Sequence, residues 1–174
     1  MNTISKWFTG LLVLLVATTA AASRDDDDDD YDFAYAGLYN ISTRALVQGG
    51  AEIAIGGFII REDEELCVVI RGRGPSVQVD TTLLGDPKIE VYQLPSGTLI
   101  DTNDNWQDHP NSELLQASGL GNVLLPEEAG IFTCLPSGAY TVHLDSASEQ
   151  YGVGIVEIID VFFEDKAELY GWDD

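Results

Sequence analysis

Hydrophobic and polar residues alternate with a period of two along several short stretches of this chain. The alternation is clearest where Tyr140, Val142 and Leu144 are separated by polar residues. A period of two places alternate side chains on opposite faces of a β-strand, so that one face is buried and the other meets solvent. The pattern predicts a strand here, and the turn residues 136–138 predict a hairpin that joins it to a partner strand at 131–135.

Other stretches predict further strands of two kinds. Residues 151–159 are apolar on both faces, which is typical of a central strand covered on two sides. In residues 51–61 the apolar positions change parity at Gly56 and Gly57, which predicts a β-bulge. Residues 62–65 are expected to form an acidic turn before the next strand. The remaining predicted strands are at 39–47, 66–73, 89–94 and 98–100, with a short edge strand at 77–79.

The spacing of these strands predicts the fold class. About eight to nine short strands separated by turn residues are typical of an antiparallel assembly and not of alternating strands and helices. We therefore expect an all-β fold, an antiparallel β-sandwich of the jelly-roll or immunoglobulin-like type. Helix content should be low, with a single helical turn at residues 112–115.

The N-terminal residues indicate export. Lys6 precedes an apolar run that is followed by small residues ending at Ala22, which is the pattern of a secretory signal peptide. The run is too short to span a bilayer, so we expect no membrane span and a secreted protein, either extracellular or periplasmic. The expected organisation is a signal peptide at 1–22, an acidic disordered leader at 23–36, the β-sandwich domain at 37–160 and an acidic tail at 161–174.

Charge narrows the range of partners. The chain has 30 Asp and Glu residues against 8 Lys and Arg residues, a formal net charge of −22. Such a surface repels nucleic-acid phosphates and favours divalent cations or basic partners, so nucleic-acid binding is not expected.

Cys67 and Cys134 are the two cysteines of the sequence. Their even number in an exported protein predicts one disulfide bond between them. The alternative is two separate buried thiols, because free cysteine is often a core residue.

Eight motifs follow one another along the chain: NISTRA at 40–45, GFII at 57–60, VIRGRGPS at 69–76, DP at 86–87, IEVYQ at 89–93, NDNW at 103–106, LPSGAYT at 135–141 and GVGIVEIID at 152–160. Together they resemble a poorly characterised β-rich domain found in secreted bacterial proteins. The resemblance covers about residues 38–160 and implies no particular activity. A more limited similarity, in residues 89–106 and 135–144, is to bacterial pre-peptidase C-terminal domains. Those are sandwiches appended to secreted enzymes, and some bind calcium or extracellular polymers.

The sequence offers little for catalysis. His109 and His143 are the two histidines, and neither belongs to a G-x-S-x-G or H-E-x-x-H motif. Carboxylates are so abundant that any pair of them is uninformative. We therefore expect a protein that is not an enzyme and that requires no cofactor, with Ca²⁺ as the one candidate ion.

A polar loop at residues 101–108 is the candidate calcium site. Calcium prefers oxygen ligands from carboxylates, amides and carbonyls, and this loop is rich in such side chains. The alternative is a solvated turn whose side chains bond to their own backbone. The candidate ligands are Asp101, Asn103, Asp104, Asn105 and Asp108.

Three larger side chains are candidates for ligand binding. Arg71 and Arg73 would recognise an anion, or would instead pair with acids such as Glu90 or Asp86. Trp106 would stack on a sugar ring, or would instead cap the end of the core.

These observations favour a secreted, non-enzymatic structural or adhesive β-sandwich module, able to self-assemble. The alternative is a calcium-dependent domain that binds a glycan or a protein. The expected partner is an extracellular polymer or protein, or a second copy of the chain.

Overall fold

The computed structural model describes residues 40–161. The predicted signal peptide, the acidic leader and all but the first residue of the acidic tail lie outside the described residues. Within the described part, six strands and three short helices follow one another along the chain. The strands are β1 (Asn40–Val47), β2 (Ala54–Arg73), β3 (Pro87–Leu94), β4 (Thr98–Asn103), β5 (Ala129–Ser146) and β6 (Gly152–Asp160), and the helices are η1 (Trp106–Asp108), α1 (Ser112–Ala117) and η2 (Leu120–Val123).

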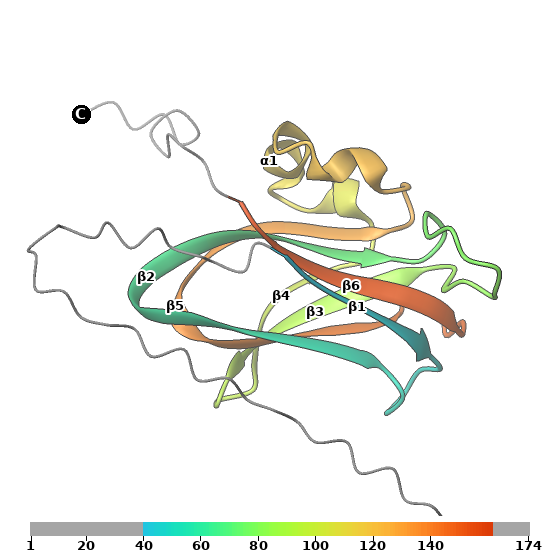
Figure 1. The fold of residues 1–174 in the computed structure, drawn as a ribbon, viewed down its shortest axis with the longest axis horizontal. Coiled ribbons are helices and arrows are strands. Elements are labelled where there is room, and N and C mark those ends of the chain that lie inside the picture. Colours follow the sequence, from blue (N-terminus) through green and yellow to red (C-terminus); the bar gives the residue numbers. More distant parts are fainter. Residues whose placement is uncertain (1–39, 162–174) are drawn as a thin grey trace, which may run out of the picture. The chain divides into compact units, whose positions relative to one another are not determined.

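All strand pairs are antiparallel, in the order β1-β6-β2-β5-β3-β4. The all-β fold class and the low helix content are therefore confirmed. β2 has 20 residues and β5 has 18, and Figure 1 shows both strands bending back at the same end of the domain. Their pairing shifts register between Ile60 and Glu65, which is where the bend lies.

The bend divides the sheet into two layers. The capped layer consists of β1, β6, the second half of β2 and the first half of β5. The open layer consists of the first half of β2, the second half of β5, β3 and β4. Because β2 and β5 run through both layers, six strands supply eight strand segments, close to the number that the sequence predicted. The edge strand predicted at 77–79 is not formed, and these residues lie in the irregular connection between β2 and β3.

Two predictions about chain reversal are wrong. Residues 131–135 and 139–145 form one continuous strand, β5, and not a hairpin, since residues on both sides of Ser137 pair with β2. The acidic residues 62–65 likewise lie inside β2 and do not end it. In both places the residues that favour turns occupy the bend, where a long strand needs a local change of direction and not a reversal.

The predicted bulge at Gly56 and Gly57 is also wrong. Both glycines keep regular register with β5, opposite Val142 and Thr141. Ile55 consequently points outward and is 54% exposed.

The main core lies between the two layers. Tyr140, Val142 and Leu144 are buried there, so the predicted alternation in β5 is confirmed. The layers approach closely at Gly72, where an added Cβ would lie 2.6 Å from Ile89 Cγ2 of the open layer. This contact between β2 and β3 shows that the two halves of the bent sheet pack face to face.

A second apolar cluster covers the outer face of the capped layer. Val69 and Phe132 of the sheet pack there against Trp106, Leu115 and Leu124. The latter three come from the connection between β4 and β5, which includes the three short helices and is called the cap below (Figure 1). The cap explains why β6 and the first half of β5 are apolar on both faces. None of the helices in the described part of the chain has the length and apolar character needed to cross a membrane.

Candidate functional site

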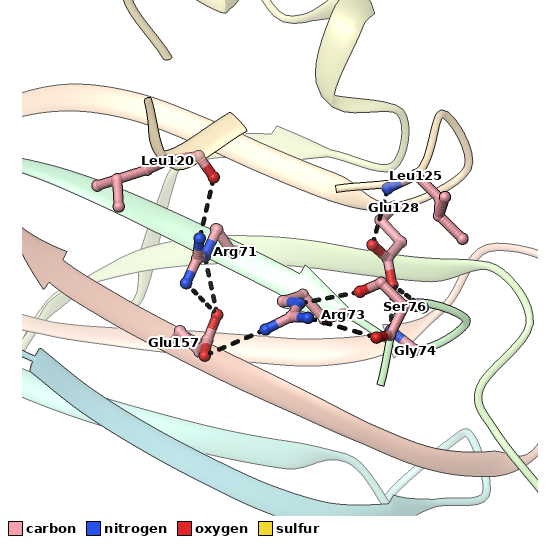
Figure 2. A network of polar contacts seen from close by, with 8 residues as sticks. All are labelled: Arg71, Arg73, Gly74, Ser76, Leu120, Leu125, Glu128 and Glu157. Atoms are coloured by element: carbon pink, nitrogen blue, oxygen red, sulfur yellow. Dashed lines mark hydrogen bonds and ion pairs between the residues drawn. The ribbon is translucent and has the colours of Figure 1, made fainter. Parts of the chain in front are cut away.

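Arg71 and Arg73 lie in a polar network beneath the cap (Figure 2). Arg71 Nε donates to Glu157 Oε2 at 2.8 Å, and its Nη2 lies 2.7 Å from the same oxygen. Its Nη1 donates to the backbone oxygen of Leu120 in η2. Arg73 Nη1 is 3.6 Å from Glu157 Oε1, and Arg73 Nε donates to Ser76 Oγ. One carboxylate of β6 therefore serves two arginines of β2.

The predicted arginine partners, Glu90 and Asp86, are replaced by Glu157. The reason is topological, because Arg71 and Glu157 are cross-strand partners in β2 and β6. Glu90 belongs to β3 in the open layer, where it instead bonds to Lys88 and Tyr92. Both guanidinium groups already contact acceptors within the protein, and an anionic ligand would have to displace those acceptors.

Glu128 is a second buried carboxylate near this network, with no measurable exposure. Its Oε1 accepts the backbone N–H groups of Gly74 and Ser76, and its Oε2 accepts that of Leu125. These three bonds satisfy a charge that would otherwise be costly to bury. Glu128 thereby fixes the loop after β2 to the end of the cap.

The predicted disulfide joins Cys67 and Cys134. The two residues are directly opposite each other in β2 and β5, next to the bend. Both contribute to the cluster beneath the cap.

Trp106 lies inside the cap and is only 8% exposed. It packs against the outer face of the capped layer with Leu115 and Phe132. This position corresponds to the core-capping alternative, and stacking on a sugar ring would require the cap to open.

The candidate calcium ligands divide between the core and the surface. Asn103 is buried, its Oδ1 accepts the N–H of Gly130, and its Nδ2 donates to the backbone oxygen of Asn105. No group of three His, Cys, Asp or Glu side chains within residues 40–161 is arranged to hold a metal ion. A calcium site would have to use backbone or amide oxygens beside Asp101, Asp104 and Asp108, and it stays a prediction.

A groove runs along β4, and we call it the β4 groove. Its volume is about 380 Å³. Both Asp101 of β4 and His109, which is 6% exposed, line the groove. The lining residues are Leu99, Ile100, Asp101, Thr102, Asn103, Asp108, His109 and Pro110.

The contacts of His109 indicate which of its ring nitrogens carries the proton. The backbone N–H of Asn111 donates to His109 Nδ1 at 3.2 Å, so Nδ1 is an acceptor and the ring proton is on Nε2. Nε2 lies 3.3 Å from both carboxylate oxygens of Asp101. His109 is thus a neutral donor to Asp101, and both of its ring nitrogens are occupied.

Within residues 40–161 no segment covers the outer face of the open layer, and we call this face the open face. Ile55 and Ile59 of β2 are 54% and 78% exposed there. Next to them Tyr92 of β3 contacts His143 of β5, with ring centroids 4.7 Å apart. Ile55, His143 and Glu90 are cross-strand neighbours, so the apolar and aromatic groups share one face.

No family model matches the chain, and no curated protein sequence matches it either. Among solved structures, the fold is similar to that of the pre-peptidase C-terminal domain of a collagenase from Bacillus anthracis, with a TM-score of 0.44 and 7% sequence identity. The alignment covers 69% of this chain and 89% of that domain. A likeness this distant assigns no activity, and the function proposed below is inferred from the chain's own residues.

Sequence reasoning missed Glu157, Glu128 and the pairing of Asp101 with His109. Glu157 had a usable signal, because it is an acid within a strand that is apolar on both faces. A charge in such a strand must be paired when it is buried. Glu128 and His109 lie in connecting segments, where no local pattern marks a buried polar group.

Proposed function

We propose that this protein is a secreted, non-enzymatic structural or adhesive module that makes contact through its open face. The observation that carries the proposal is the exposure of Ile55 and Ile59 beside Tyr92 and His143. Clustered apolar and aromatic groups on a sheet face are the composition expected of a contact surface.

The contrast between the two outer faces supports this choice. The capped layer buries its outer face beneath Trp106, Leu115 and Leu124, whereas the open face has no such cover among residues 40–161. The first half of β2 also forms an edge of the open layer, since the other described strands leave its second side unpaired. An exposed apolar edge strand is suited to pairing with another chain.

A binding role also agrees with the contacts that the two histidines make. His109 has both ring nitrogens in hydrogen bonds, and the ring of His143 lies against that of Tyr92. A general base needs a free nitrogen within reach of a substrate proton. His109 could act in this way only by giving up a hydrogen bond.

The test compares the exported protein with matched surface variants. Size-exclusion chromatography and negative-stain microscopy report self-assembly, and retention on an extracellular matrix preparation of the producing cells reports adhesion. We expect assembly or retention for the wild type and its loss in Ile55→Ser/Ile59→Ser. Leu46→Ser is the control, because Leu46 of β1 is also 54% exposed but belongs to the capped layer.

Two results would contradict the proposal. One is a wild-type protein that is strictly monomeric and is not retained. The other is an unchanged response of the double variant, which would move the contact away from the open face.

A further inference from the structure

We infer that the β4 groove binds the cationic side chain of a lysine or arginine in an extended segment of a basic partner protein. The inference goes beyond the proposed function, because the groove lies along β4 and none of its lining residues is among the isoleucines and aromatic residues that carry the proposal for the open face.

The groove lies at the edge of the sheet and not on one of its faces. Five consecutive residues of β4, from Leu99 to Asn103, line it. Successive residues of a strand point to opposite faces, so a cavity that touches all of them must run along the strand edge. β4 pairs with β3 on its other side, and within residues 40–161 no further strand occupies this edge. An extended segment of a partner therefore has access to it.

Asp101 is held in position at this edge. Its carboxylate lies 3.3 Å from His109 Nε2, and its Oδ1 also accepts the N–H of Thr102 at 2.8 Å. The Asp101 side chain keeps 26% of its surface exposed, whereas that of His109 keeps 4%. Two donors thus fix the orientation of a carboxylate that still reaches solvent, which lowers the entropic cost of binding a ligand there.

The negative charge of Asp101 is not cancelled by its partner. His109 Nδ1 accepts the N–H of Asn111, so the ring donates to Asp101 as a neutral group. Asp108 also lines the groove, is exposed and adds a second carboxylate. A cation that enters the groove would meet two anions with no competing positive charge among the groove residues.

The apolar part of the groove selects an organic cation over a bare ion. Leu99 and Ile100 are 47% and 38% exposed beside Asp101. Lysine and arginine bury their hydrocarbon stems against such surfaces while the charged end reaches a polar group. A hydrated metal ion would gain nothing from these two side chains.

The charge of the molecule favours the same partner. With a net charge of −22 the chain attracts basic proteins over long distances, and its own Arg71 and Arg73 are occupied with Glu157. The partner segment is therefore basic and extended, with one cationic side chain inserted between Asp101 and Asp108.

The experiment is an NMR titration of the full exported chain at about 0.15 M salt, where long-range attraction by the other acids is screened. The probe is a short peptide with one lysine flanked by threonines, and its twin carries glutamine instead of lysine. We expect the lysine peptide alone to shift the resonances of residues 98–103 and 108–111. Asp101→Asn should weaken binding about fivefold to tenfold, as for the loss of one charge-assisted contact.

Further variants separate charge from position. Asp80→Asn removes an equal charge from an exposed residue that does not line the groove, and it should leave binding unchanged. His109→Gln keeps an N–H donor for Asp101 and should bind almost as well as the wild type. His109→Leu removes the donor and should bind more weakly, with thermal melting used to check that both variants are folded.

Three outcomes would overturn the inference. These are equal shifts with both peptides, an unchanged affinity in Asp101→Asn, and a response of these residues to millimolar CaCl₂ with none to the lysine peptide. In each case, retention of the wild type on the matrix would still support the proposed function. Loss of wild-type retention would count against the proposed function whatever the groove does.

Discussion

Arg71 and Glu157 form a buried ion pair between β2 and β6 that also contacts the cap. Burial lowers the pKa of Arg71, and the negative charge of Glu157 acts against that lowering. The guanidinium group also reaches the backbone oxygen of Leu120 in the cap. A buried pair of this kind is costly to disrupt, because removal of one partner leaves the other as an uncompensated charge.

We predict that Glu157→Gln lowers the free energy of unfolding by about 3 kcal/mol or more, since Arg71 would lose its buried counter-ion. Urea denaturation measures the change. The matched control is Glu90→Gln, which removes the partly exposed pair with Lys88 and should cost less than about 1 kcal/mol. Equal losses in the two variants would contradict this view of the network.

A second residue-scale prediction concerns Tyr92, whose hydroxyl donates to Glu90 Oε2 at 2.9 Å. This bond raises the pKa of Tyr92 above its ordinary value of 10.0. The bond therefore contributes its full stability below the unfolded-state pKa, and the contribution is lost as the pH rises through the folded-state pKa. Glu90→Gln should lower the Tyr92 pKa, and NMR titration between pH 8 and 12 would measure it. An unchanged titration would show that the bond is absent in solution.

At the scale of elements, β2 and β5 organise the domain because each belongs to both layers. Their pairing continues on both sides of the bend, and it brings glycines of one layer against side chains of the other. The spacing of the layers is therefore sensitive to the volume of single residues in β2.

Gly72→Ala should destabilise the domain by about 1 to 3 kcal/mol, the usual cost of overpacking. The added methyl group would lie 2.6 Å from Ile89 Cγ2 and 3.0 Å from Leu144 Cδ1. Gly57→Ala is the control in the same strand, because its nearest atom is Tyr140 O at 3.5 Å. It should change the stability by less than about 0.5 kcal/mol. Similar effects of both variants in thermal melting would argue against close packing at Gly72.

The disulfide links the same two strands beside the bend. The cysteines are separated by 67 residues, and closing a loop of that size stabilises the fold by at most about 4 kcal/mol in the chain-entropy description. Cys67→Ala/Cys134→Ala should accordingly have a lower urea midpoint than the oxidised wild type. Reductant should destabilise the wild type and leave the variant unchanged. Two thiols that react freely in the unreduced, denatured wild type would contradict the bond.

At the scale of the whole molecule, negative charge governs the response to cations. Because the chain has a net charge of −22, many of its sites attract calcium weakly. A response of the protein to added calcium therefore does not by itself show a specific site. A calcium site in residues 101–108 must therefore be distinguished from this background.

The calcium prediction is tested by melting a chain that begins at Tyr31, which lacks the run of aspartates before it. If the loop binds calcium, millimolar Ca²⁺ should raise the melting temperature more than Mg²⁺ does, because a ligand of the native state stabilises it. Asp104→Ala should abolish the difference. An equal response to both ions would leave the loop as a turn.

The sequence by itself determined the all-β class, most of the strand positions and which two cysteines pair. Tyr140, Val142 and Leu144 alternate with polar residues, and a period of two indicates which face of a strand is buried. The disulfide needed no geometry, because two cysteines allow one pairing. The sequence also marked residues 101–108 as a candidate site. It predicted a calcium site made of side-chain oxygens, and it did not predict the groove that Asp101 and His109 line.

Only the tertiary structure decided how the strands continue and which charges meet. The turn residues at 136–138 have the same local chemistry in a hairpin and in a bent strand, and only pairing with β2 on both sides distinguishes the two. Arg71 and Glu157 are 86 residues apart, and they meet because β6 lies beside β2. Local pattern specifies which face of a strand is buried, whereas the partner of a buried charge depends on strand order, which is a property of the whole fold.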